Sequence, residues 1–255
     1  MSRRRPAIAV IGGSQIIGMC LTIAVALSSG KWDLHQSEVL KWGAASGVLG
    51  LVGLVAFYAA LSTGLMGIVS PIASFGVVIP LCIGLLSGEQ PSKAQYLGIL
   101  VAVVGIVLAS GPELSSRATA KPVVLALIAA VAFGFAVYFM AQGGRTGNPI
   151  MTVVTMRVVQ VCILLTIAGL MRSNGGLVTR DIPMLTAIGV TDATANILFT
   201  YASMDGMLSI VSVLGSLYPV VTVILAWIFL KERLMPIQYV GIVATFIGVV
   251  SITAG

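Results

Sequence analysis

Apolar runs of about 20 residues recur along nearly the whole chain, and this is the length that an α-helix needs to cross the hydrocarbon of a bilayer. Only 9% of the 255 residues are charged and 58% are hydrophobic, with a mean hydropathy of +1.09. A soluble domain carries about 25% charged residues, so this chain cannot cover a water-facing surface. Because the short alternating segments of a β-barrel do not occur in the sequence, we expect an all-α integral membrane protein.

The apolar runs predict nine transmembrane helices joined by short loops. We expect these helices at residues 7–28, 39–61, 64–87, 94–111, 122–143, 149–171, 182–203, 206–230 and 236–254. The polar stretch at 111–121 is the longest loop and is predicted to link a first half, 1–110, to a second half, 122–255.

Two segments of the chain repeat each other. Gly88–Leu108 reads GEQPSKAQYLGILVAVVGIVL, Lys231–Ser251 reads KERLMPIQYVGIVATFIGVVS, and Glu89 and Glu232 lie 143 residues apart. If the repeated unit has five helices, it crosses the membrane an odd number of times, so a tandem copy is inverted. Inverted-topology repeats are typical of secondary transporters, which hold a substrate near the middle of the bilayer between the two halves.

The same offset leaves the predicted helix at 122–143 without a partner in the first half. We therefore expect that an N-terminal helix is missing, which gives four and five helices of a 5 + 5 plan. Residues 7–28 also resemble a secretory signal, because they follow a basic start and contain Ala24-Val25-Ala26. Their apolar stretch is longer than a signal core of about 7–15 residues, and it aligns with the span at 149–171, which favours a retained helix.

The repeats resemble the EamA-type transporters of the drug/metabolite transporter superfamily. The resemblance is carried by Tyr58–Ser110 and Tyr201–Ala254, which share a Tyr-Ala pair, a small-residue turn, a span with serine and proline, a glutamate and a glycine-rich last helix. It implies ten helices, two cytoplasmic termini and transport of small metabolites or drugs, often outward, across the cytoplasmic membrane. The chain departs from this pattern at its start, because SRRRP at 2–6 would follow the first helix in relatives.

The orientation in the membrane stays open at this stage. A cytoplasmic N-terminus places nine basic residues inside and four outside, as the positive-inside rule favours. The family arrangement places the C-terminus inside, which with nine helices requires an external N-terminus. Without the three arginines at 3–5 the balance is six against four, so we take the family arrangement as the expectation.

Charged and polar side chains inside the apolar runs are the candidates for a substrate site. Arg157 and Asp192 lie within predicted spans, where a charge costs several kcal/mol and therefore faces protein or water. Asn196 follows Asp192 by four residues, on the same face of a helix. The offset matches Arg157 with Ser14, which is next to Gln15. The predicted cavity residues are Gln15, Tyr58, Arg157, Asp192, Asn196 and Tyr201.

Other interpretations of these residues remain open. Arg157 and Asp192 form a structural pair between two helices in one alternative, and Arg157 extends to the membrane surface in another. Asp192 is also a candidate proton carrier. Glu89 and Glu232 lie at predicted helix ends beside basic residues, so we expect surface ion pairs worth at most about 1 kcal/mol each, with a gating role as the alternative.

The sequence predicts no cofactor and no metal site. The three cysteines lie in three different apolar runs, and the single histidine, His35, lies in a loop. No GxxxxGK[ST] motif occurs, so ATP is not expected as the energy source. The net charge of +6 is scattered through short loops, which argues against nucleic-acid binding.

These observations predict a secondary transporter, more specifically an exporter, of a small organic solute. Its expected partners are that solute, the lipid bilayer and a second copy in a homodimer. An alternative is a non-transporting fragment or subunit that completes its fold with a partner chain. An intramembrane enzyme is less favoured, because the sequence has no HExxH or GxSxG motif and little acid–base equipment.

Overall fold

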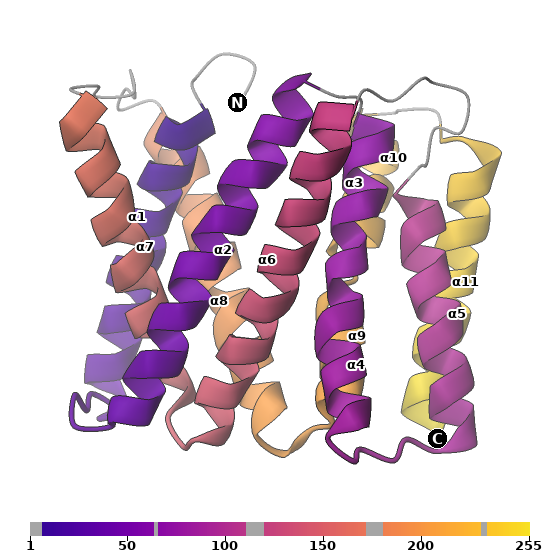
Figure 1. The fold of residues 1–255 in the computed structure, drawn as a ribbon, viewed down its shortest axis with the longest axis horizontal. Coiled ribbons are helices and arrows are strands. Elements are labelled where there is room, and N and C mark those ends of the chain that lie inside the picture. The colour runs from indigo at the N-terminus through magenta and orange to yellow at the C-terminus, as the bar shows by residue number, and fades with distance from the viewer. Residues whose placement is uncertain (1–6, 64–65, 111–119, 172–180, 231–233) are drawn as a thin grey trace. The chain divides into compact units, whose positions relative to one another are not determined.

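The computed structural model describes residues 7–63, 66–110, 120–171, 181–230 and 234–255, and all regular secondary structure among these residues is helical (Figure 1). The elements are α1 (Ala7–Ser28), α2 (Ser37–Thr63), α3 (Met66–Ser74), the 3-10 helix η1 (Phe75–Val77), α4 (Val78–Leu86), α5 (Lys93–Ala109), α6 (Ala120–Arg145), α7 (Pro149–Met171), α8 (Ile182–Asp205), α9 (Leu208–Gly215), α10 (Tyr218–Leu230) and α11 (Pro236–Ala254). The predicted class, an all-α membrane protein, is confirmed. Glu232 and most of the predicted linker at 111–121 lie outside the described residues.

Seven spans among the described residues are long and apolar enough to cross a membrane, so the predicted count of nine is not confirmed. One difference is α5, whose 17 residues extend about 26 Å, a little less than the hydrocarbon thickness of about 30 Å. The other is the predicted span at 206–230, which the structure divides into α9 and α10.

Proline and turn residues explain the break between α9 and α10. Ser216 and Leu217 form a turn, and Pro219 follows without a backbone N–H to continue the hydrogen bonds of a helix. In the first half, η1 interrupts the path from α3 to α4 at a similar place, between Pro71 and Pro80. At the offset of 143 the turn at 216–217 corresponds to residues 73–74, directly before η1, so both copies carry an irregular backbone in the same part of the repeat.

The helix starts repeat at the offset found in the sequence. α5 and α11 begin 143 residues apart, at Lys93 and Pro236. The starts of α1 and α7, of α2 and α8, and of α3 and α9 are separated by the same interval to within two residues. The sequence repeat is therefore also a repeat of secondary structure.

The chain forms two compact units, and each takes segments from both halves of the sequence. Unit 1 consists of Met1–Leu51 and Ala136–Asp205, and unit 2 consists of Val52–Phe135 and Gly206–Gly255. The repeat boundaries at 1–110 and 122–255 stay a prediction, since a compact unit need not coincide with a sequence repeat.

Within unit 1, α1 packs against α7 and α8. Ala26, near the end of α1, clusters with Ile150 and Met151 at the start of α7. Gln15, nearer the start of α1, contacts Arg157, which lies further along α7. The equivalent helices α1 and α7 are therefore antiparallel.

Within unit 2, α5 and α11 lie side by side along a stripe of small residues (Figure 1). A Cβ on Gly98 would lie 2.8 Å from the carbonyl oxygen of Gly248, and one on Gly105 would lie 2.8 Å from that of Gly241. As the residue number rises along α5, its partner on α11 falls, so this equivalent pair is also antiparallel. Each unit thus shows the inversion that an odd number of crossings predicts.

Candidate functional site

Arg157 is a buried charge inside a membrane-spanning helix. It lies on α7 in unit 1 and is only 1% exposed. The start of α7 is defined by Asn148, whose Oδ1 accepts the Met151 N–H at 3.1 Å, and by Pro149, whose fixed φ suits the first helical position. The Asn148 Nδ2 also donates to the Lys31 carbonyl oxygen at 2.8 Å, which ties α7 to the loop after α1.

The Arg157 guanidinium joins three helices of unit 1. Its Nη1 donates to Gln15 Oε1 on α1, and its Nη2 lies 2.8 Å from Asp192 Oδ2 on α8, at ion-pair distance without the alignment of a hydrogen bond. Asn196, one turn further along α8, donates through Nδ2 to Asp192 Oδ1 at 3.2 Å and to the Asp192 carbonyl oxygen at 2.7 Å. The structure therefore brings together four of the six predicted cavity residues.

The two charges of this cluster differ in exposure. The Arg157 side chain is 2% exposed, whereas that of Asp192 is 48% exposed. Arg157 Nε and Gln160 Oε1, three residues apart on α7, have no hydrogen-bond partner among the described residues. The cluster thus offers one donor and one acceptor in addition to a balanced ion pair.

Glycines allow the helices to approach closely around the cluster. A Cβ on Gly18 would lie 3.2 Å from the Gly189 carbonyl oxygen and 3.7 Å from Arg157 Cζ, and one on Gly50 would lie 3.0 Å from Gln160 Nε2. Sequence reasoning did not assign these glycines to the site. The signal that could have indicated them is their place in apolar spans, where small residues often mark helix contacts.

The two tyrosines of the predicted cavity are not part of the hydrogen-bond network described for Arg157. Tyr58 belongs to unit 2, where its ring packs edge-on against Phe57 with centroids 6.1 Å apart. Tyr201 is on α8 but is 41% exposed. Among the described residues we find no hydrogen bond between either tyrosine and Arg157, so an aromatic wall stays a prediction.

Glu89 makes a contact that sequence reasoning missed. Its Oε1 accepts the Leu208 N–H at 2.5 Å and its Oε2 accepts the Ser209 N–H at 2.9 Å, both at the start of α9. The expected ion pair with the neighbouring Lys93 remains untested. A local sequence pattern does not predict a contact between residues 119 positions apart. The sequence showed only that Glu89 lies at the end of a predicted helix.

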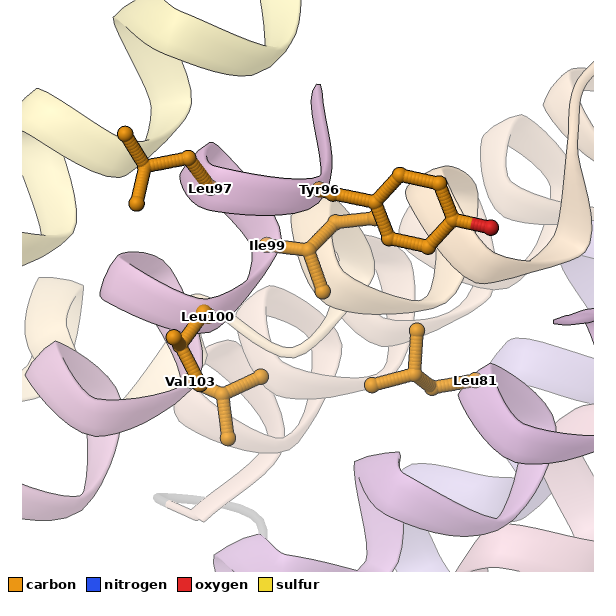
Figure 2. Close-up of a pocket in the computed structure, with 6 residues that line it drawn as sticks. All are labelled: Leu81, Tyr96, Leu97, Ile99, Leu100 and Val103. Atoms are coloured by element: carbon orange, nitrogen blue, oxygen red, sulfur yellow. The ribbon is translucent and has the colours of Figure 1, made fainter. Parts of the chain in front are cut away.

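An apolar groove of about 500 Å³ lies between α4 and α5 in unit 2 (Figure 2). It is lined by Leu81, Tyr96, Leu97, Ile99, Leu100 and Val103. The phenol oxygen of Tyr96 is the one polar side-chain atom of this lining, and Figure 2 shows it at the edge of the group. Such a lining lacks the convergent polar groups that orient a solute, so the Arg157 cluster is the better candidate site.

Metal-ligating side chains do not gather in the part of the chain that the structure describes: it contains no group of three or more His, Cys, Asp or Glu residues able to hold a metal ion. His35 is exposed between α1 and α2, with its ring 3.3 Å from Asp33. The His35 backbone N–H donates to the Asp33 carboxylate at 2.8 Å and lowers its pKa. Both residues lie in the loop between α1 and α2, and neither belongs to the helices that carry the Arg157 cluster.

Comparison with known proteins identifies the family. A crystal structure described as "Crystal structure of protein" aligns with 98% of this chain and 88% of its own chain, with a TM-score of 0.79 and 17% identity, which shows a shared fold. The "Uncharacterized protein MJ1333.1" of Methanocaldococcus jannaschii is 31% identical over 96 residues, covering 37% of this chain and 70% of that protein. The profile of the EamA-like transporter family matches residues 1–111 and 120–254. The chain therefore belongs to the EamA-like transporter family, within the drug/metabolite transporter superfamily, and is a multi-pass membrane protein.

Proposed function

We propose that the protein is a secondary transporter that exports a small organic solute across the cytoplasmic membrane by alternating access. Family membership supports transport in general, and the antiparallel equivalent helices support two inverted repeats that move against each other. The direction, the membrane and the mechanism are parts of the proposal.

The observation that carries the proposal is the half-exposed carboxylate of Asp192 on a spanning helix. A charged side chain in contact with lipid costs roughly 2.5–3.5 kcal/mol on insertion scales. Asp192 is 48% exposed and lies in the middle of α8, so we infer that its free surface borders water or solute rather than lipid. Arg157 behind it then forms the wall of a hydrated path.

The chemistry of the cluster favours a solute with small net charge. The charges of Arg157 and Asp192 offset each other, so the cluster does not present the uncompensated positive charge that binds phosphates. Arg157 Nε and Gln160 Oε1 supply a donor and an acceptor for a polar group that carries both, such as a hydroxyl or an amide. Because both atoms are buried in this conformation, we place the polar end of the solute against them in a state of the transport cycle in which the cluster opens.

A transport assay on reconstituted protein tests the proposal. Vesicles loaded with a panel of amino acids, nucleosides and organic cations are assayed for efflux, and the solute that moves is then tested with Arg157→Lys. Lysine keeps the charge but lacks the planar fork and the Nε donor, so we expect at least about tenfold slower efflux at equal reconstitution. Lys41→Gln is the control, because Lys41 is exposed and forms an ion pair with Glu38 of its own helix.

The result decides between transport and a purely structural cluster. Efflux that is unchanged in Arg157→Lys overturns the assignment of the site, while absence of efflux for every solute overturns the proposed function. Loss of protein yield in the variant is read separately by size-exclusion chromatography, and only monodisperse protein is assayed.

A second candidate is a subunit that becomes active when another chain covers α8. This helix has only 17% of its span buried, against 33% for its equivalent α2. In unit 1, α6 covers α2, as the Ser46 hydroxyl donates to the Ala136 carbonyl oxygen at 2.9 Å, and the described residues contain no counterpart of α6 beside α8. Mass measurement in detergent distinguishes an independent transporter from a subunit that needs another chain. A monomer that transports contradicts the subunit candidate. A homodimer, or a partner chain whose helix is bound at Leu198 on α8, supports it.

A further inference from the structure

The carboxylate of Glu89 caps a helix that has no cap of its own. α9 begins at Leu208 after Met207, whose side chain makes no capping hydrogen bond. Both oxygens of Glu89 accept N–H groups of the first turn of α9, at 2.5 and 2.9 Å. A negative charge at this end of a helix is favourable, because the unpaired N–H groups carry partial positive charge. A residue of the first half therefore supplies the cap for a helix of the second half.

The backbone of Glu89 is fixed on α4 by a Schellman motif. Gly88 has φ of +93°, its N–H donates to the Leu85 carbonyl oxygen at 3.2 Å, and the Glu89 N–H donates to that of Gly84 at 3.2 Å. A hydrophobic residue is usual at the position of Glu89 in this motif. Here the motif instead aims a carboxylate at α9, so α4 and α9 are connected through a rigid turn.

The helix that Glu89 caps, α9, is short and has non-helical residues on both sides. α9 has eight residues and is flanked by Gly206-Met207 and by the turn at Ser216-Leu217, so it is too short to be stable alone. Ser209 and Ser212 on this helix are 0% and 3% exposed, yet their hydroxyls have no partner among the described residues. By contrast, the buried Ser203 hydroxyl donates to the Phe199 carbonyl oxygen at 2.8 Å.

Unpaired buried hydroxyls indicate that this position of α9 is not the one that satisfies all of its polar groups. We propose that Glu89 is a releasable latch, which holds α9 in the present conformation and lets it go in another state of the transport cycle. The inference rests on the proposed alternating access, but its test requires no solute movement. Failure of the latch and failure of the transport proposal are therefore separate results.

Accessibility of a single cysteine on α9 tests the latch. In full-length protein reconstituted in vesicles, Cys20, Cys82 and Cys162 are replaced by alanine and Ser212→Cys is introduced as the reporter. Alkylation by N-ethylmaleimide is then timed with and without Glu89→Gln. Glutamine keeps one acceptor but places an NH2 group against an N–H donor, so we expect labelling to be at least about fivefold faster.

A second variant breaks the latch without changing any charge. A Cβ on Gly84 would lie 2.5 Å from Glu89 Oε2, which is the far end of a flexible side chain, and 3.0 Å from the Ser209 backbone nitrogen. Gly84→Ala therefore displaces the carboxylate and also crowds the start of α9, and it is expected to speed labelling as Glu89→Gln does. The matched controls are Glu38→Gln, an exposed glutamate, and Gly12→Ala, which has open space around it. Both controls are expected to leave the labelling rate unchanged.

A reference cysteine separates latch release from general loosening. Thr22→Cys, at a position on α1 that is 0% exposed, is labelled in parallel in its own cysteine-free protein. Faster labelling at 212 but not at 22 supports the latch. Equal acceleration at both positions, or an unchanged rate at 212 in Glu89→Gln and Gly84→Ala, overturns it. If Glu89→Gln does not yield folded protein, Glu89→Asp, which keeps the charge but is one methylene shorter and cannot reach both N–H groups of α9, replaces it in the same comparison.

Discussion

At the scale of single residues, the stability of unit 1 depends on how the charge of Arg157 is paired. A guanidinium that is 1% exposed is tolerated only with partners, here Gln15 and Asp192. Removing one partner of a buried pair leaves an unpaired charge and costs about 3–5 kcal/mol when both groups are buried. Since Asp192 is half exposed and Gln15 remains, we expect about 1–3 kcal/mol for Asp192→Asn, measured as a lower unfolding temperature in detergent.

The control for this prediction is Asp205→Asn, an exposed carboxylate at the end of the same helix, which we expect to have little effect. A double-mutant cycle with Arg157→Met isolates the pair itself. If the double variant is more stable than the sum of the single losses implies, the ion pair is real. Simple additivity of the two losses would contradict it.

The free-energy cost of burying a charge is also the reason that the residues of the Arg157 cluster could be predicted from the sequence. Arg157 and Asp192 stood out because charges are expensive in apolar spans, and helical spacing added Asn196. Tyr58 and Tyr201 could not be placed, because aromatic residues suit lipid, core and cavity alike. The contact of Glu89 with α9 depends on how distant helices pack, which local spacing does not encode.

At the scale of elements, the close contact of α5 with α11 depends on glycine. A Cβ on Gly248 would lie 2.5 Å from the Ala102 backbone nitrogen and 2.7 Å from the Gly98 carbonyl oxygen, neither of which can move alone. Overpacking of this kind typically costs about 1–3 kcal/mol, more than the gain of about 0.5–1 kcal/mol from better helix propensity. We expect Gly248→Ala to lower the unfolding temperature in detergent.

Gly12→Ala is the matched control for this contact, because no atom lies within 4 Å of the added methyl group. This variant should be neutral or slightly stabilised, as alanine is the better helix former. Equal unfolding temperatures for the two variants would mean that α5 and α11 do not approach as closely as described.

The start of α7 is a second element-scale dependence. Asn148 is 4% exposed and makes two hydrogen bonds, one to the Met151 N–H and one to the Lys31 carbonyl oxygen. Asn148→Ala removes both and should destabilise the protein by about 1–2 kcal/mol. Asn148→Asp keeps the cap but loses the donor, so thermal unfolding should place it between alanine and the parent protein. A fully stable alanine variant would contradict the role of the cap.

Helices as such were predicted well from apolar runs, and their boundaries repeat at the predicted offset. The interruption between α9 and α10 was not predicted, because Ser216-Leu217, where the backbone turns, lies inside one long apolar run. Pro219 was visible as a weakness, but proline is common in membrane helices, so it did not distinguish a kink from a break. The glycines along α5 and α11 were also visible in the sequence, but the sequence did not show that these two helices contact each other.

At the scale of the whole molecule, inversion makes the ends of equivalent helices a test of the fold. α5 begins after its cap, Ser92, and α11 begins after Met235, which is 143 residues later. Because α5 and α11 are antiparallel neighbours, these two positions belong at opposite faces of the membrane. A direct repeat would place both on one face, so the pair reports inversion without requiring knowledge of which face is cytoplasmic.

We expect Ser92→Cys and Met235→Cys, each in a protein without its native cysteines, to react with a membrane-impermeant maleimide from opposite sides. In intact cells one of the two is labelled, and the other is labelled only after the membrane is opened. Both positions directly precede a helix and are exposed, Met235 to 38%, so access to reagent is not limiting. Labelling of both from the same side would contradict the inverted repeat, and with it the two-sided access that the proposed transport mechanism requires.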